Sequence, residues 1–149
     1  MHNQIKILEF GCSSMMNLRY MQNSMPDSFI FYGIDIIKIK INKFLFSLDL
    51  FKDEMDPALS EISFDLIFTR ATLQHIPPNK VIVIIKKLSV ILSPGGYFCI
   101  NEANSKGNDE GLVVGHRVRS TFLYNYKKMF LDLGFNFISK QGNVLIFTK

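Results

Sequence analysis

Short apolar runs recur along this chain, separated by segments with helical periodicity or with turn residues. Five runs have the length of a strand and are predicted as strands: residues 5–10, 29–37, 44–50, 64–70 and 97–101. Strands that alternate with helical segments are typical of a parallel sheet with helices on its faces. The pattern therefore predicts an α/β fold.

Residues 81–92 are ambiguous by pattern alone. They open with a run of β-branched residues, which suits a strand, yet Ile84, Leu88 and Ile91 recur at helical spacing after Pro78. We interpret this segment as a helix that covers the sheet. Upstream, Asp56 with Pro57 is a signal for a helix start or a turn within residues 52–62.

The last third of the chain predicts three features. Residues 103–115 are rich in Gly, Asn, Ser and acidic residues, which indicates a mobile loop over one edge of the sheet. Residues 120–133 place aromatic residues on one helical face and end at Gly134, which predicts an amphipathic helix. Residues 135–140 and 144–147 flank a Gln-Gly-Asn turn and predict a hairpin.

Composition narrows the class of protein. The 149 residues are 48% hydrophobic and 20% charged, which predicts one globular domain. No apolar run has the length that a bilayer requires, and the first residues do not form a leader peptide, so we expect a cytoplasmic protein with no membrane partner. The net charge is +4 and the basic residues are scattered. A nucleic-acid partner is therefore not expected.

The segment from the first strand through Gly11 to Leu18 is a strand, a tight loop and a helix. Such a loop can present backbone N–H groups and a helix N-terminus to an anionic ligand. A dinucleotide-binding loop would have further glycines where Ser13 and Met15 stand, so an ordinary strand-to-helix turn is the alternative. Cys12 can contact a ligand from this loop, whereas Cys99 is predicted in the core. The two cysteines have no metal-ligand or disulfide pattern, and we expect no metal.

Acidic residues follow the next two strands. Asp35 ends the second strand 24 positions after Gly11, the spacing of an acid that binds ribose hydroxyls. A turn aspartate is the alternative. Asp49 ends the third strand, after a crossover of residues 36–43 that is short for a parallel connection. The fourth strand leads into Arg70 and His75, which we expect at the same edge of the sheet.

Taken in order, these segments resemble the class I S-adenosylmethionine-dependent methyltransferases. The motifs that carry the resemblance are L-E-F-G-C-S-S, Y-G-I-D-I, S-L-D-L, F-D-L-I-F-T-R-A-T-L-Q-H-I-P and L-S-P-G-G-Y-F-C-I-N-E, followed by the terminal hairpin. The resemblance implies a Rossmann-like three-layer sandwich with a mostly parallel seven-stranded sheet. Its strand order would be 3-2-1-4-5-7-6, with an antiparallel C-terminal hairpin.

The resemblance also implies S-adenosylmethionine as the cofactor and assigns residues to its parts. Glu9, Gly11, Cys12, Ser13 and Arg70 would line the methionine end, Asp35 with Ile36 the ribose, and Asp49 with Leu50 the adenine. Many relatives have extra N-terminal helices that cover the cofactor, and this sequence starts almost directly at the first strand. That cover is then missing, or it comes from residues 103–119, a second copy of the chain, a partner subunit or a part of the protein outside this sequence.

Methyl transfer needs a base only when the acceptor must lose a proton. His75 and His116 are the candidate bases, although a loop-capping role for His75 and a surface position for His116 are the simpler interpretations. The leading hypothesis is a methyltransferase acting on a small molecule. The alternative is a catalytically weak or inactive methyltransferase-like domain that binds a partner. A nicotinamide-dependent enzyme would require the missing glycines, and an RNA-modifying enzyme would require clustered basic residues.

Overall fold

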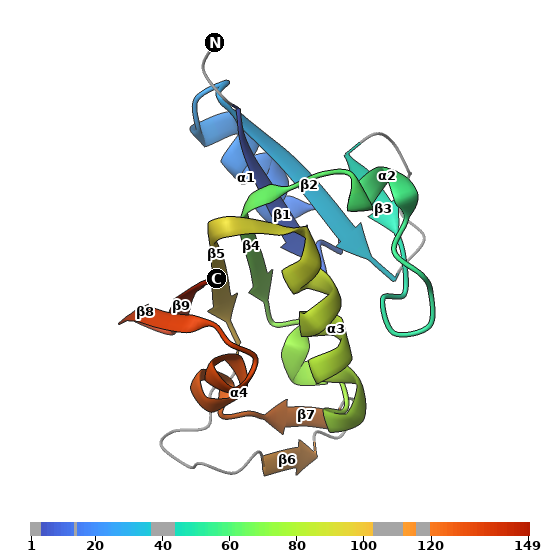
Figure 1. Cartoon of the computed structure of the whole chain (residues 1–149), viewed down its shortest axis with the longest axis vertical. Helices are drawn as coiled ribbons and strands as arrows, with labels where there is room; N and C mark the ends of the chain where they lie inside the picture. The colour runs from blue at the N-terminus through green and yellow to red at the C-terminus, as the bar shows by residue number, and fades with distance from the viewer. Residues whose placement is uncertain (1–3, 14, 37–43, 103–111, 116–119) are drawn as a thin grey trace.

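The central feature of the fold is a seven-stranded sheet of order β3-β2-β1-β4-β5-β9-β8. The computed structural model describes residues 4–13, 15–36, 44–102, 112–115 and 120–149. Neighbouring strands from β3 to β5 pair in parallel, while β9 pairs antiparallel with both β5 and β8. This arrangement confirms the predicted fold class, strand order and terminal hairpin (Figure 1).

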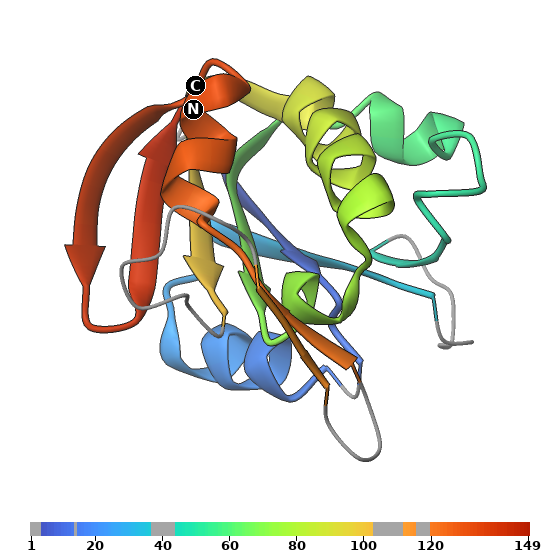
Figure 2. The same cartoon turned by 90° about the horizontal axis from the view of Figure 1, so that it is seen from below.

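The strands of this sheet are β1 Ile5–Phe10, β2 Phe29–Asp35, β3 Leu45–Ser47, β4 Phe64–Arg70, β5 Leu92–Asn101, β8 Asn136–Gln141 and β9 Val144–Thr148. The helices are α1 Met16–Ser24, α2 Pro57–Ser60, the 3-10 turn η1 Leu73–His75, α3 Pro78–Ile91 and α4 Tyr126–Asp132. Helix α1 lies on one face of the sheet, and α3 and α4 lie on the other (Figure 2). No helix in these described ranges is long and apolar enough to cross a membrane.

Several predicted boundaries change. Helix α3 is confirmed for the ambiguous segment and begins earlier, at Pro78. Strand β5 begins directly at Leu92, so the Ser-Pro-Gly-Gly turn lies inside the strand range, where the pairing with β4 shifts register between Phe64 and Leu66. Strand β3 is only three residues long, and the helix within residues 52–62 is only one turn, capped by the Asp56 side chain.

The predicted helix over residues 120–133 is wrong in its first half. Residues Ser120–Leu123 form β7, which pairs antiparallel with β6, Leu112–Gly115, in a separate two-stranded sheet. Helix α4 begins only at Tyr126, because the Asn125 side chain accepts a hydrogen bond from the Lys128 N–H at 3.0 Å and caps the helix there. The predicted loop is therefore partly a strand. Residues 103–111 and 116–119, including His116, lie outside the described residues.

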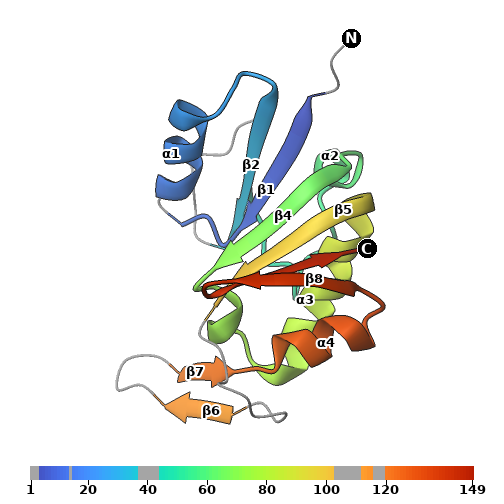
Figure 3. The same cartoon turned by 90° about the vertical axis from the view of Figure 1, so that its left-hand side faces the viewer.

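The β6–β7 pair lies beyond the carboxyl ends of β4 and β5, as Figure 3 shows. Strand β7 contacts η1, the turn that follows β4. Just after β7, the Tyr124 hydroxyl donates a hydrogen bond of 2.6 Å to the carbonyl of Ile76. The pair is thus attached to the edge where a Rossmann-like sheet binds its ligands.

Candidate cofactor site

The loop after β1 is held against the carboxyl end of β2. The N–H groups of Gly11 and Cys12 both donate to the carbonyl of Ile34, at 2.8 and 3.2 Å. Gly11 has a φ of +80°, and a Cβ atom there would overlap the side chain of Thr72. Glycine is therefore required at this position both for the backbone conformation and for the close approach of the loop after β4.

Two non-glycine residues of the loop adopt the conformation that glycine usually supplies. Ser13 has a φ of +42° and Met15 a φ of +60°. The left-handed region costs a residue with a side chain roughly 1–2 kcal/mol relative to right-handed backbone. The loop thus keeps a positive φ angle at Ser13, where a G-x-G-x-x-G loop would have its second glycine, and another at Met15. The conformation is retained at the expense of strain.

Asp35 lies at the carboxyl end of β2 and is buried. Its Oδ2 accepts a hydrogen bond of 2.6 Å from the Ser13 N–H. A carboxylate that accepts from a backbone N–H makes a charge-assisted hydrogen bond, which is stronger than a neutral one. Asp35 therefore positions the loop after β1. The same residue is the one predicted to contact the ribose. Ile36, the next residue, is largely exposed.

A chain of three polar side chains connects β1, α1 and β4. Asn17, the second residue of α1, donates from Nδ2 to Glu9 Oε1 at 2.7 Å. The Asn17 Oδ1 accepts from Arg70 Nη1 at 3.0 Å. Glu9 is only 2% exposed. Its second carboxylate oxygen, Oε2, is buried and has no hydrogen-bond partner among the residues that the structure describes.

The environment of Glu9 shifts its titration. Burial raises the pKa of Glu9 above its ordinary value of 4.5, while the hydrogen bond from Asn17 and the positive charge of Arg70 partly oppose that rise. The negative charge of Asp35 raises it further. The sequence analysis identified Glu9 and Arg70 but missed Asn17. The signal for Asn17 was a polar residue in the first turn of the helix that follows the loop.

Asp49 and Leu50 directly follow β3. The N–H of the preceding residue, Leu48, donates to the carbonyl of Asp35 at 2.9 Å, which holds this segment beside the end of β2. The Asp49 carboxylate accepts from the N–H of Phe51 at 3.1 Å, within its own turn. Leu50 is buried in the large core. The structure thus brings this segment beside Asp35, while the predicted adenine contacts stay a prediction.

Cys12 lies in the loop after β1, as predicted, whereas Cys99 is not fully buried in the core as predicted. The Cys12 side chain is buried and points toward β2, since a Cβ on Gly33 would lie 2.7 Å from its sulfur. Burial first, and the nearby charges of Asp35 and Glu9 second, raise the pKa of Cys12 to about 12, so its thiol is neutral near pH 7. Cys99 is only half-buried and lines a cavity.

Glu102 organises the turn that carries His75. Its buried carboxylate accepts from the N–H groups of Thr72, at 2.8 Å, and Gln74, at 3.2 Å. Burial raises the pKa of Glu102, and these backbone hydrogen bonds partly oppose the rise. His75 is half-buried, with its Nε2 3.3 Å from the amide nitrogen of Gln74. The sequence analysis did not find this role of Glu102.

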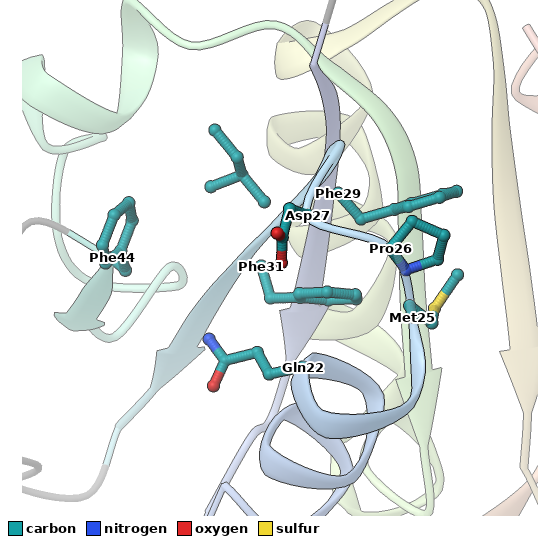
Figure 4. A pocket seen from close by; sticks show the side chains of 8 residues that line it. Gln22, Met25, Pro26, Asp27, Phe29, Phe31 and Phe44 are labelled. Carbon is teal, nitrogen blue, oxygen red and sulfur yellow. The ribbon is translucent and has the colours of Figure 1, made fainter.

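Two cavities among the described residues are each lined in part by residues of α1. One, of about 350 Å³, begins at Asn17 and Arg70 and continues over apolar residues of β4, β5 and β9. The other, of about 280 Å³, lies at the amino end of β2, where Phe29, Phe31 and Met25 line it (Figure 4). Only the first adjoins the polar chain of Glu9, Asn17 and Arg70.

Comparison with known proteins identifies the family. The model of the methyltransferase-domain family matches residues 2–141. Because this match spans most of the sequence, the chain belongs to the methyltransferase-domain family, which is a family of enzymes. The predicted class, the S-adenosylmethionine-dependent methyltransferases of class I, is confirmed.

Solved structures show the same fold at low sequence identity. A Burkholderia thailandensis 1,6-didemethyltoxoflavin-N1-methyltransferase, solved with 1,6-didemethyltoxoflavin and S-adenosylhomocysteine, is 14% identical with a TM-score of 0.74, over 97% of this chain and 70% of that one. An S-adenosylmethionine-dependent methyltransferase from Mesorhizobium loti is 11% identical with a TM-score of 0.68, over 99% and 92%. CalS10, an amino pentose methyltransferase from Micromonospora echinaspora solved with S-adenosylmethionine, is 11% identical with a TM-score of 0.64, over 98% and 84%. No curated protein matches the chain.

Proposed function

We propose that this chain transfers a methyl group from S-adenosylmethionine to a small-molecule acceptor. The observation that carries the proposal is the group of buried acids at the carboxyl ends of β1 and β2. Glu9 has a buried oxygen without a described hydrogen-bond partner, and Asp35 lies beside the loop. Such an arrangement fits a ligand that brings both a positive charge and hydroxyl groups.

The residues that would hold the cofactor divide by its parts. Glu9, Arg70 and the backbone of Gly11, Cys12 and Ser13 would hold the methionine end. Asp35, with Ile36 beside it, would accept from the ribose hydroxyls, and Asp49 with Leu50 would lie at the adenine. The position of Asp35 supports its part, because it ends β2 beside the loop that follows β1, at the edge where sheets of this kind bind ligands.

The bound cofactor supplies a methyl group on a positively charged sulfur, so the driving force for transfer lies in the cofactor itself. The chain would bind the cofactor and the acceptor, align the methyl group with the acceptor and exclude water. The turn held by Glu102 keeps Thr72 over Gly11 and carries His75 at the same edge. His75 would take a proton only from an acceptor that must lose one.

A small acceptor is supported by the cavity beside Arg70. Its volume of about 350 Å³ lies within the range of small-molecule sites, and its lining is mostly apolar with Asn17, Arg70 and Asn101 as polar groups. The structural neighbours include enzymes named for 1,6-didemethyltoxoflavin and for an amino pentose. Both are small molecules.

The test is calorimetric titration with S-adenosylhomocysteine, using Asp35→Asn as the variant. The new amide oxygen can still accept from the Ser13 N–H, so the loop is kept while the charged acceptor is lost. We expect micromolar binding by the wild type and an affinity roughly 10- to 100-fold lower in the variant, the range for a hydrogen bond to a charged group. Asp27→Asn is the matched control, because Asp27 is exposed at the amino end of β2.

Two outcomes would contradict the proposal. One is a wild type that does not bind the ligand, and the other is an Asp35→Asn variant that binds as tightly as the wild type. Binding without turnover, over a panel of small acceptors, would favour the catalytically inactive alternative. The retained positive φ angles of Ser13 and Met15 support an intact loop instead.

A further inference from the structure

The Asn17 side chain makes one hydrogen bond to a negative group and one to a positive group. It donates to Glu9 Oε1 and accepts from Arg70 Nη1. The opposite orientation of the amide would place its oxygen against a carboxylate and its nitrogen against a guanidinium, and both contacts would be repulsive. The two charged neighbours therefore fix the orientation of this amide.

Glu9 and Arg70 differ in how firmly each is held. Glu9 is buried on β1, whereas Arg70 is exposed at the end of β4. A long arginine side chain at the surface loses about 2 kcal/mol of rotamer entropy when it is fixed in place. Asn17 supplies a fixed acceptor for it, because α1 begins directly after the constrained loop.

We propose that Asn17 is a positioning residue that holds a carboxylate and a guanidinium at a set separation, so that together they recognise the amino-acid end of the methyl donor. Glu9 Oε2 would accept from the ammonium group. The remaining N–H groups of Arg70 would donate to the carboxylate of the donor. This inference rests on the proposed function, and it adds a residue on α1 to those that recognise the donor.

The chemistry of a zwitterion explains why one amide would serve both groups. An α-amino acid has an ammonium and a carboxylate on the same carbon atom, so its receptor needs an anion and a cation at short range. Without a spacer, a glutamate and an arginine at that range would pair directly and satisfy each other. The Asn17 amide donates one hydrogen bond to Glu9 and accepts one from Arg70, which leaves Glu9 Oε2 for a ligand.

The test compares two ligands that differ only at the recognised end. S-adenosylhomocysteine contains the amino-acid end, whereas 5′-methylthioadenosine keeps the adenosine and the sulfur but lacks it. For Asn17→Leu, we expect the affinity for S-adenosylhomocysteine to fall between about 10-fold and about 100-fold, as when hydrogen bonds to charged groups are lost. The affinity for 5′-methylthioadenosine should change less than about 2-fold, because Asp35 and the adenine end are untouched.

Two further variants separate positioning from a general structural role. Asn23→Leu makes the same change at an exposed position near the other end of α1, and it should alter neither affinity. Asn17→Gln retains the amide on a longer side chain, and it should restore part of the selectivity for S-adenosylhomocysteine. Thermal unfolding of each variant confirms that it is folded at the titration temperature.

The outcomes are distinct. Equal weakening of both ligands in Asn17→Leu would overturn the inference, because Asn17 would then support only the loop. No change in either affinity would also overturn it, as would a wild type that binds the two ligands equally. A wild type that binds neither ligand would instead overturn the proposed function on which the inference depends.

Discussion

The two faces of the central sheet are packed very differently. On the face covered by α2, α3 and α4, 24 buried residues of the described chain form one cluster. On the α1 face the corresponding cluster has five: Ile7, Cys12, Leu18, Phe31 and Leu45. The face with the smaller core is also the one on which Asn17 and Arg70 adjoin a cavity.

This difference separates stability from ligand recognition. Interiors packed at crystal-like density resist change, and most folding free energy comes from apolar burial. A buried charge such as that of Glu9 lowers the free energy of unfolding. Functional sites commonly contain such destabilising features. We therefore expect the large cluster to carry most of the free energy of unfolding, and the α1 face to trade stability for binding.

The largest expected effect comes from truncating one ring on each face. Phe98→Ala should lower the free energy of unfolding by about 3–5 kcal/mol, because Phe98 is fully buried and packs against Phe130 at 5.0 Å between ring centroids. Phe31→Ala should cost only about 3 kcal/mol, the lower end of this range, since Phe31 borders the 280 Å³ cavity. Denaturant unfolding measures both. Equal losses would contradict the proposed difference between the faces.

The second prediction concerns the cost of Glu9. Because its pKa is raised in the folded state above 4.5, the unfolded chain loses this proton first, and folded stability falls as the pH rises through that range. Glu9→Gln removes this loss and should be more stable than the wild type by about 1–3 kcal/mol near pH 7, with little difference below pH 4.

Unfolding curves at several pH values measure the effect, and titration should show weaker binding of S-adenosylhomocysteine by the same variant. Glu61→Gln, at an exposed position, is the control and should show no such gain. A Glu9→Gln variant whose advantage does not grow with pH would exclude a buried carboxylate as the source of the cost.

A third prediction concerns the cost of a buried polar group on the face covered by α2, α3 and α4. The Tyr126 hydroxyl is buried without a described hydrogen-bond partner, and burial, with the nearby charge of Glu102, raises the pKa of Tyr126. Tyr126→Phe should therefore stabilise the protein by about 1 kcal/mol. Tyr124→Phe should destabilise it by about 1 kcal/mol, because that hydroxyl donates to Ile76. Thermal unfolding checks the opposite signs, and the same sign for both would refute the argument.

The smallest expected effect is at the loop that begins the α1 face. Ser13→Gly should raise the free energy of unfolding by about 0.5–1 kcal/mol, because glycine adopts positive φ without strain but loses more entropy on folding. Ser13→Ala keeps the strain and should leave stability almost unchanged. Chemical denaturation compares the three proteins. A gain for alanine as large as for glycine would show that the serine side chain, not its φ angle, sets the cost.

The errors of the sequence-based predictions have a common physical cause. Residues 120–133 contain aromatic residues that suit a helix or a strand equally, and pairing with Leu112–Gly115 decided for a strand in the first part. Hydrophobic periodicity does not encode the pairing of β7 with β6, which is a tertiary contact. It also does not encode the Asn125 cap, which is a local hydrogen bond. The same holds for β3, which is shorter than its apolar run because it pairs with β2 over only three residues.

The site shows the same division. Asp35 and Arg70 were predicted at the ligand edge because each lies at the end of an apolar strand, and parallel strands bring their carboxyl ends to one edge. The role of Glu9 was predicted from the resemblance to the methyltransferases. Asn17 was missed because its role depends on a contact to Arg70, 53 positions away in the sequence. The inward direction of the Cys12 side chain likewise depends on Gly33, a residue of another strand.

The amino-acid sequence by itself determined the alternation of strands and helices and the residues at which the strands end, because hydrophobic periodicity and turn residues act locally. The order of the sheet was predicted from the resemblance to the methyltransferases. Only the tertiary structure decided which side chains meet at the carboxyl ends of the strands, and how unequally the two faces are packed. Those outcomes depend on hydrogen bonds and contacts between distant segments, such as the amide of Asn17 between a buried carboxylate and an exposed guanidinium.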